Sequence, residues 1–250
     1  MTTMQSVERA LDVALIVMRN GGSTVMADRV FGNILKGFKK DKVTAVWRLD
    51  SVTALSEAEG RPSIIYRPVG AIGINLVRAS EASALSERVA RGEVDTGALE
   101  SEVARINSLA PPYTRWVMIA ASSFTAAIFS QLPGKGWGAL GIAFLAAGVG
   151  QFLRLLLQAR KIPVAPRTLI CGVLSASVAA VGLRMGLSQA APWTMIASVI
   201  YMVPGLPLIN GFVDLLSHNF LLVGLERIAN AVYIFLILAV AIAFASTVVM

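Results

Sequence analysis

The residues best suited to chemistry lie between Met202 and His218. Here Asn210, Asp214 and His218 follow one another at intervals of four residues, a spacing that places them on one face of a helix. A carboxylate next to an imidazole can take up and release a proton. Asp214 is also one of only two acidic residues after position 115. The pattern therefore predicts a proton-carrying polar face, with Asp214 as its strongest member and His218 as a weaker one.

The segment just before this face interrupts an apolar run. Pro204 and Pro207 lack amide hydrogens, so an intact helix cannot continue through them. Lipid cannot satisfy the backbone groups that such a break frees, and breaks of this kind are tolerated where they line a cavity, as at transporter substrate sites. A helix that restarts near Leu208 would point free N–H groups at an anion. We therefore expect a transport pathway lined by Pro204, Gly205, Pro207, Asn210 and Asp214.

A simpler interpretation of the same stretch stays open. Residues 208–222 could form an amphipathic helix that lies on the cytoplasmic surface of a membrane. Asp214 and His218 would then be solvated side chains with no part in transport.

Charge is distributed unevenly along the 250 residues, of which 56% are hydrophobic. Residues 1–115 hold 15 of the 22 basic and 13 of the 15 acidic side chains, whereas residues 116–250 hold seven basic side chains and two acids, Asp214 and Glu226. This pattern indicates a soluble-like half joined to a membrane half. Nucleic-acid binding is excluded as the function, because the first half is nearly balanced in charge and has no basic stripe with interleaved aromatic residues.

The first half is predicted to be a small α+β domain over residues 1–112. Helical periodicity occurs at 5–20, 25–38, 80–91 and 97–109, and alternation typical of strands occurs at 43–49, 51–55, 63–67 and 72–76. Pro111 and Pro112 end the domain. It contains no nucleophile elbow, phosphate-binding loop or metal-ligand spacing, so we expect no enzyme activity, cofactor or metal.

The second half is predicted to be a transmembrane domain over residues 113–250. Its five apolar stretches are each long enough to cross a bilayer as a helix, at about 115–132, 136–157, 168–188, 192–209 and 228–250. The loop after the second stretch carries Arg160, Lys161 and Arg167, whereas the opposite loops carry only Lys135 and Arg184. The excess of positive charge predicts a multi-pass protein with a cytoplasmic N-terminus.

Two arginines lie within apolar stretches. Arg154 and Arg184 are each a few residues from a predicted helix end, so both can extend to the nearest interface. The alternative is that one of them is the counter-ion of an anionic substrate.

The sequence resembles the threonine/serine exporter family in two regions. The first region resembles the family's signature. It consists of Met202-Val203-Pro204-Gly205-Leu206-Pro207-Leu208-Ile209-Asn210, followed by Asp214-Leu215, Gly224, Arg227 and Ala231. The family's opening helices are similar to Ala14–Met18, Gly21-Gly22-Ser23-Thr24 and Arg29-Val30, and its domain junction to Arg105-Ile106 before Pro111-Pro112. The resemblance covers essentially the whole chain and adds Arg227 to the candidate site.

The resemblance implies export of threonine and serine across a bacterial inner membrane, driven by the proton gradient. Members of the family have a cytoplasmic domain followed by about ten membrane helices, and two five-helix units can together complete a transporter of this kind. With about five predicted helices, this chain resembles the larger half of a split exporter, whose partner is a small, separate membrane protein. Some split members resemble exporters of dicarboxylates such as succinate, so the resemblance leaves two substrate classes open.

Two other functions compete with export. One is a membrane-anchored regulatory or assembly protein that acts through the domain Met1–Ala110 on a soluble partner. The other is a membrane-embedded hydrolase, which is disfavoured because it needs a nucleophile and base or a metal pair.

Overall fold

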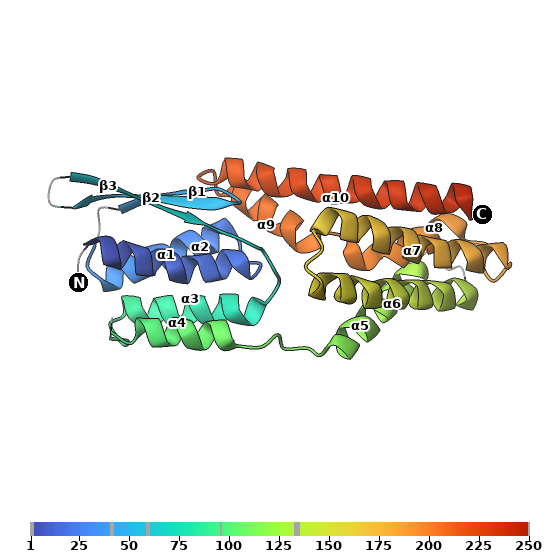
Figure 1. The fold of residues 1–250 in the computed structure, drawn as a ribbon, viewed down its shortest axis with the longest axis horizontal. Helices are drawn as coiled ribbons and strands as arrows, with labels where there is room; N and C mark the ends of the chain where they lie inside the picture. Colours follow the sequence, from blue (N-terminus) through green and yellow to red (C-terminus); the bar gives the residue numbers. More distant parts are fainter. Residues whose placement is uncertain (1–2, 41–42, 59–60, 96, 133–135, 250) are drawn as a thin grey trace. The chain divides into compact units, whose positions relative to one another are not determined.

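A computed structural model of the chain describes residues 3–40, 43–58, 61–95, 97–132 and 136–249, and is mostly helical (Figure 1). Lys135, one of the predicted loop cations, lies outside these residues. The chain divides into two compact units, each described by itself below. The first unit contains residues 1–112 and 205–229, and the second contains residues 113–204 and 230–250. The prediction of two domains that meet at residues 112 and 113 stays a prediction.

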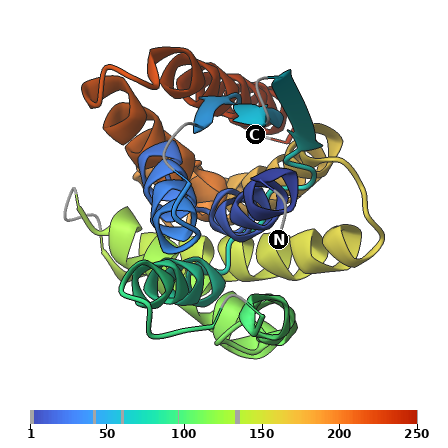
Figure 2. The same cartoon turned by 90° about the vertical axis from the view of Figure 1, so that its left-hand side faces the viewer.

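The first unit is built around helix α1 (Thr3–Arg19). All six residues from Val13 to Met18 are buried, which is the pattern of a helix covered on every side. Helix α2 (Thr24–Gly37) lies beside α1, and α3 (Leu76–Ala90) and α4 (Leu99–Ser108) form the next layer (Figures 1 and 2). The four helices match the four predicted helical stretches of the N-terminal half.

A three-stranded antiparallel sheet covers the other side of α1 and α2. Its strands are β1 (Val43–Trp47), β2 (Ser51–Ala58) and β3 (Arg61–Pro68), paired in chain order. Trp47 opposes Val52 in the register and packs edge-on against Phe31 of α2, with ring centroids 6.1 Å apart. The inward positions Trp47, Val52, Ala54 and Ile65 are buried, and they join the helices in one core.

The prediction of a fourth strand at 72–76 is wrong. Gly73 donates its amide hydrogen to the Arg19 carbonyl at 2.8 Å, and Asn75 donates its own to the Asn20 carbonyl at 3.1 Å. The segment is therefore bound to the end of α1 instead of the sheet. Its alternating Ile72 and Ile74 are exposed, so the apolar pattern does not mark a buried face here.

The second unit is a helical assembly with small residues at its centre. It contains α5 (Arg115–Ser130), α6 (Trp137–Ala159), α7 (Val164–Arg184), α8 (Ala191–Val199), the 3-10 turn η1 (Ile200–Met202) and most of α10 (Leu221–Val248). Its helices meet at fully buried alanines, which allow their backbones to approach closely: Ala143, Ala146, Ala147, Ala176, Ala179 and Ala180.

Three helices of the described residues are long and apolar enough to cross a membrane: α6, α7 and α10. A fourth span is possible if α8 with η1 and the following α9 (Gly205–Leu216) count as one broken span. The remaining predicted segment, 115–132, forms α5, which is apolar but only 16 residues long. The described residues thus contain three or four candidate spans, compared with the five predicted, which is consistent with a helical membrane protein.

Candidate functional site

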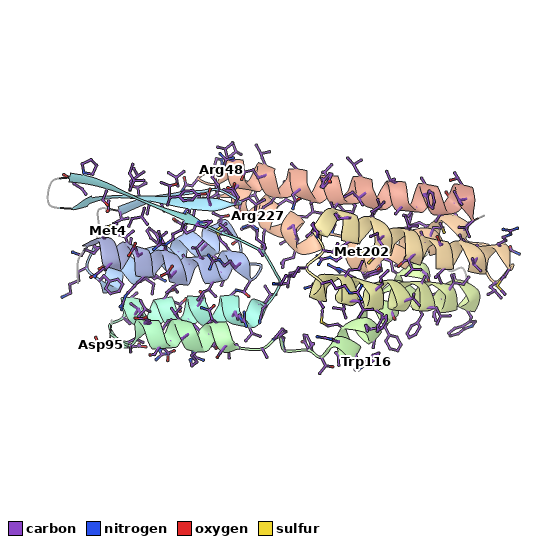
Figure 3. The ribbon with its side chains drawn as sticks, viewed as in Figure 1. Met4, Arg48, Asp95, Trp116, Met202 and Arg227 are labelled. Carbon is purple, nitrogen blue, oxygen red and sulfur yellow. The ribbon has the colours of Figure 1, made fainter. Side chains whose placement is uncertain are left out.

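The candidate site is a buried ion pair between Asp214 and Arg227, within the first unit. Asp214 lies on α9 and is fully buried, while Arg227 lies in the second turn of α10 and is 4% exposed. The Nε atom of Arg227 is 3.0 Å from Oδ2 of Asp214, an ion-pair distance without hydrogen-bond alignment. Figure 3 marks Arg227 where α10 begins. The surface-helix interpretation requires a solvated Asp214, whereas the structure shows this side chain fully buried.

The carboxylate of Asp214 binds the N-terminus of α2. Its Oδ1 accepts hydrogen bonds from the amides of Thr24 at 2.9 Å and Val25 at 3.3 Å. Its Oδ2 accepts a third hydrogen bond, from the Thr24 hydroxyl at 2.8 Å. The first amides of a helix have no intrahelical acceptor, and the helix dipole favours a negative charge beside them. Every partner of this carboxylate is a hydrogen-bond donor or a cation.

Arg227 and Asn210 bind the turn that precedes α2. Arg227 donates through Nη2 to the Gly22 carbonyl at 3.4 Å and to the Thr24 hydroxyl at 3.3 Å. Asn210, four residues before Asp214 on α9, donates through Nδ2 to the Gly21 carbonyl at 2.8 Å. The structure thus brings together three of the predicted residues, and all three contact residues 21–25. We call these three side chains and the turn 21–25 the turn-binding cluster.

Two glycines allow α9 and α10 to approach closely enough for the ion pair. A Cβ atom added to Gly211 would lie 3.2 Å from the Gly224 carbonyl oxygen, and one added to Gly224 would lie 2.8 Å from the Gly211 carbonyl oxygen. The two helices therefore cross backbone to backbone. Asp214 and Arg227 each follow one of these glycines by three residues, so the crossing places their side chains side by side.

His218 does not join the cluster. Helix α9 ends at Leu216, and His218 follows it with a left-handed backbone, φ 59°, and an exposed side chain. Its Nδ1 lies 3.1 Å from the Leu216 carbonyl oxygen. The predicted polar face therefore holds for Asn210 and Asp214 and does not extend to His218.

The predicted helix break is present. Helix α8 and η1 end at Met202, and α9 begins at Gly205, three residues before the predicted restart at Leu208. Pro207 lies in the first turn of α9, where a missing amide hydrogen costs little because that amide has no helical acceptor. The break is thus confined to Val203 and Pro204.

The second acid of the membrane half, Glu226, binds the turn between β1 and β2. Its Oε2 accepts a hydrogen bond from the Leu49 amide at 3.0 Å, and its Oε1 forms an ion pair with Arg48. Figure 3 labels Arg48. Sequence reasoning missed this partner, and it also missed Thr24 and Val25 as partners of Asp214. Charge counting identifies the two acids, but their partners are about 180 and 190 residues away in the chain.

The site offers no support for metal-dependent chemistry. Across the parts of the chain that the structure describes, no three His, Cys, Asp or Glu side chains gather closely enough to hold a metal ion. The single cysteine, Cys171, is buried in α7 of the second unit. The turn-binding cluster holds α9 and the start of α10 to the turn 21–25 through an ion pair and hydrogen bonds.

Apolar helices long enough to cross a membrane, together with a helix interrupted at Val203 and Pro204, are features of membrane transport proteins. The family model of threonine/serine exporters (ThrE) matches residues 8–249. The chain therefore belongs to the threonine/serine exporter family.

Two relatives resemble it over most of their length. It is 23% identical over 238 residues to a protein of Klebsiella aerogenes named probable succinate transporter subunit YjjP, which covers 95% of this chain and 91% of that protein. It is 24% identical over 241 residues to the Escherichia coli protein of the same name, with 95% and 92% covered. No solved structure matches the chain.

Proposed function

We propose that this protein is the larger subunit of a two-component exporter that moves small carboxylates out of the cytoplasm. The substrate is either threonine and serine or a C4 dicarboxylate such as succinate. The observation that carries the proposal is the match to an exporter family over nearly the whole chain. The name of both relatives, a succinate transporter subunit, supports the dicarboxylate alternative.

The second component would be a small membrane protein that supplies the remaining helices. Both relatives are named as subunits, and three or four candidate spans are few for a complete transporter built from repeats. The positive charge of Arg160, Lys161 and Arg167 supports a bacterial inner-membrane location with the N-terminus in the cytoplasm.

Asp214 is our proposed site of proton coupling. A protonated carboxyl would lose the charge that Arg227 and the α2 N-terminus stabilise, so protonation would weaken every contact of this side chain at once. Release of α9 from α2 would then change the backbone next to Pro204, Gly205 and Pro207. In this proposal Asn210 and Arg227 position the pathway, and His218 contributes little because it is exposed.

The test is a metabolite profile of the growth medium. Cells without the gene are compared with cells that express it together with a candidate small partner. A gene-dependent rise of external threonine and serine, or of succinate, is the expected result. An unchanged profile, with the protein confirmed in the membrane by immunoblot, would contradict export and favour a regulatory role of the N-terminal half.

A further inference from the structure

Arg154 is a charged side chain inside a candidate membrane span, α6, five residues before the helix ends. It is partly buried, and its Nη1 donates a hydrogen bond to the Tyr201 carbonyl at 3.2 Å. That carbonyl has no 3-10 helical partner, because the residue three positions later is Pro204, which has no amide hydrogen. The guanidinium therefore contacts the 3-10 turn just before the helix break.

No carboxylate of the second unit can neutralise Arg154. Residues 113–204 and 230–250 contain seven basic side chains and no Asp or Glu. The two acids at 205–229 are engaged in the first unit, Asp214 with Arg227 and Glu226 with Arg48. Among the ion pairs of the described residues, none includes Arg154. A partly buried cation with four further N–H donors favours an anionic ligand.

Polar groups from three elements lie around the same turn. The hydroxyls of Ser175, on α7, and Tyr201, on η1, are hydrogen bonded at 3.0 Å. Both pack on the backbone of Gly150, where an added Cβ atom would overlap the two oxygens. Gly150 precedes Arg154 by four residues on α6, so these groups and the guanidinium share one side of that helix.

Gln151 adds a second unsatisfied group to this side of α6. It is 4% exposed, precedes Arg154 by three residues, and its Oε1 has no hydrogen-bond partner within the described part of the chain. A buried amide oxygen without a hydrogen-bond partner is rare in folded proteins. Because rotation of the amide exchanges its oxygen and nitrogen, Gln151 can offer an N–H group to a carboxylate.

We propose that Arg154, assisted by Gln151, Ser175 and Tyr201, binds a carboxylate of the exported substrate, and that this substrate is a dicarboxylate without an ammonium group. The proposal rests on the proposed export function. An amino acid would bring an ammonium into a unit that has no acid to receive it, whereas a dicarboxylate suits a unit with only positive charges.

Uptake of labelled succinate into inside-out membrane vesicles tests this site. The vesicles carry the full-length protein with its partner subunit. In wild-type vesicles, unlabelled succinate should compete with the label, while threonine and butyrate should not. Arg154→Gln should raise the KM for succinate by about thirty-fold or more, the lower end of what removing one partner of a buried charged pair costs. Arg154→Lys should recover part of that loss.

Arg184→Gln is the matched control. It removes a guanidinium from the last residue of α7, which is exposed and bonded to the Val249 carbonyl at 3.3 Å, and should leave the KM unchanged. If an immunoblot shows that Arg154→Gln is missing from the membrane, Arg154→Lys and Ser175→Ala test the site instead. A raised KM for succinate in these two variants supports the site, and an unchanged KM contradicts it.

The outcomes separate the two proposals. Transport of succinate with an unchanged KM in the Arg154 variants would overturn the binding site while export stands. Transport of threonine alone would overturn the dicarboxylate class. Loss of partner co-purification in Arg154→Gln, with a normal KM in the remaining complex, would show that Arg154 pairs with the partner subunit. No gene-dependent transport of either compound would contradict the export function itself.

Discussion

Asp214 and Thr24 are 190 residues apart in the chain, yet the carboxylate of Asp214 accepts hydrogen bonds from both the amide and the hydroxyl of Thr24, at 2.9 and 2.8 Å. The two regions that resemble the exporter family, the opening helices and the broken stretch after Met202, are therefore in direct contact. Their polar residues form one cluster, in which the start of α2 donates hydrogen bonds to the negatively charged side chain on α9.

Asp214→Asn tests the proposed coupling role. The amide keeps the shape of the side chain but leaves Arg227 without its negative partner in a buried position. Loss of one member of a buried pair costs about 3–5 kcal/mol of stability. We expect the variant to insert in the membrane, to melt at a lower temperature in detergent and to lose transport. Asp50→Asn, on an exposed loop, is the control and should behave as wild type. Full transport by the Asp214 variant would remove it from the mechanism.

Thr24 is expected to contribute through its hydroxyl. Thr24→Val removes the donor to Asp214 and the acceptor for Arg227, and should destabilise the protein by about 1–3 kcal/mol, the usual cost of leaving buried polar groups unpaired. Thr24→Ser keeps the hydroxyl and should recover most of this loss. Thermal unfolding of the three proteins in one detergent measures the difference. A valine variant as stable as wild type, together with a destabilised serine variant, would mean that the methyl group, and not the hydroxyl, matters.

The two ion pairs that involve α10 should differ sharply in strength. Arg227→Ala leaves Asp214 buried without a cation and should cost about 3–5 kcal/mol. Arg48→Ala removes a side chain that is 53% exposed, and should cost under about 1 kcal/mol because water and salt already screen that pair. Unfolding at low and high salt provides the measurement. A large, salt-independent loss of stability in Arg48→Ala would show that burial does not determine how much each ion pair contributes to stability.

The helix crossing gives a prediction that involves no charge. In Gly211→Ala the new Cβ atom would lie 2.9 Å from a side-chain carbon of Ile228, so α9 and α10 must separate. We expect a loss of about 1–3 kcal/mol together with weaker transport, as for other overpacked sites. Gly32→Ala is the matched control on α2, where an added Cβ meets nothing within 4 Å. It should stabilise the protein by about 0.5–1 kcal/mol, since alanine favours helix. Similar effects of both substitutions would argue against the crossing.

The sequence by itself determined the features that depend on local pattern. Apolar periodicity located the four helices of the N-terminal half, and alternation located the three strands, because burial of one face imposes those periods. Pro204 located the helix break, because its missing amide hydrogen interrupts a helix whatever surrounds it, whereas Pro207 lies in the first turn of α9. The scarcity of acids after position 115 identified Asp214, and the interval of four residues paired it correctly with Asn210.

Only the tertiary structure decided what these residues contact. The pattern extended the polar face to His218, but α9 ends at Leu216, and helix ends depend on packing more than on spacing. Alternation at 72–76 predicted a strand, but this segment forms hydrogen bonds with the end of α1 instead of pairing with the sheet. The sequence could not predict that Asp214 pairs with Thr24 or that Arg154 pairs with Tyr201. A contact between distant segments produces no periodic pattern in the sequence of either segment. Folding alone brings the first amides of α2 to the buried carboxylate of Asp214, which accepts their hydrogen bonds.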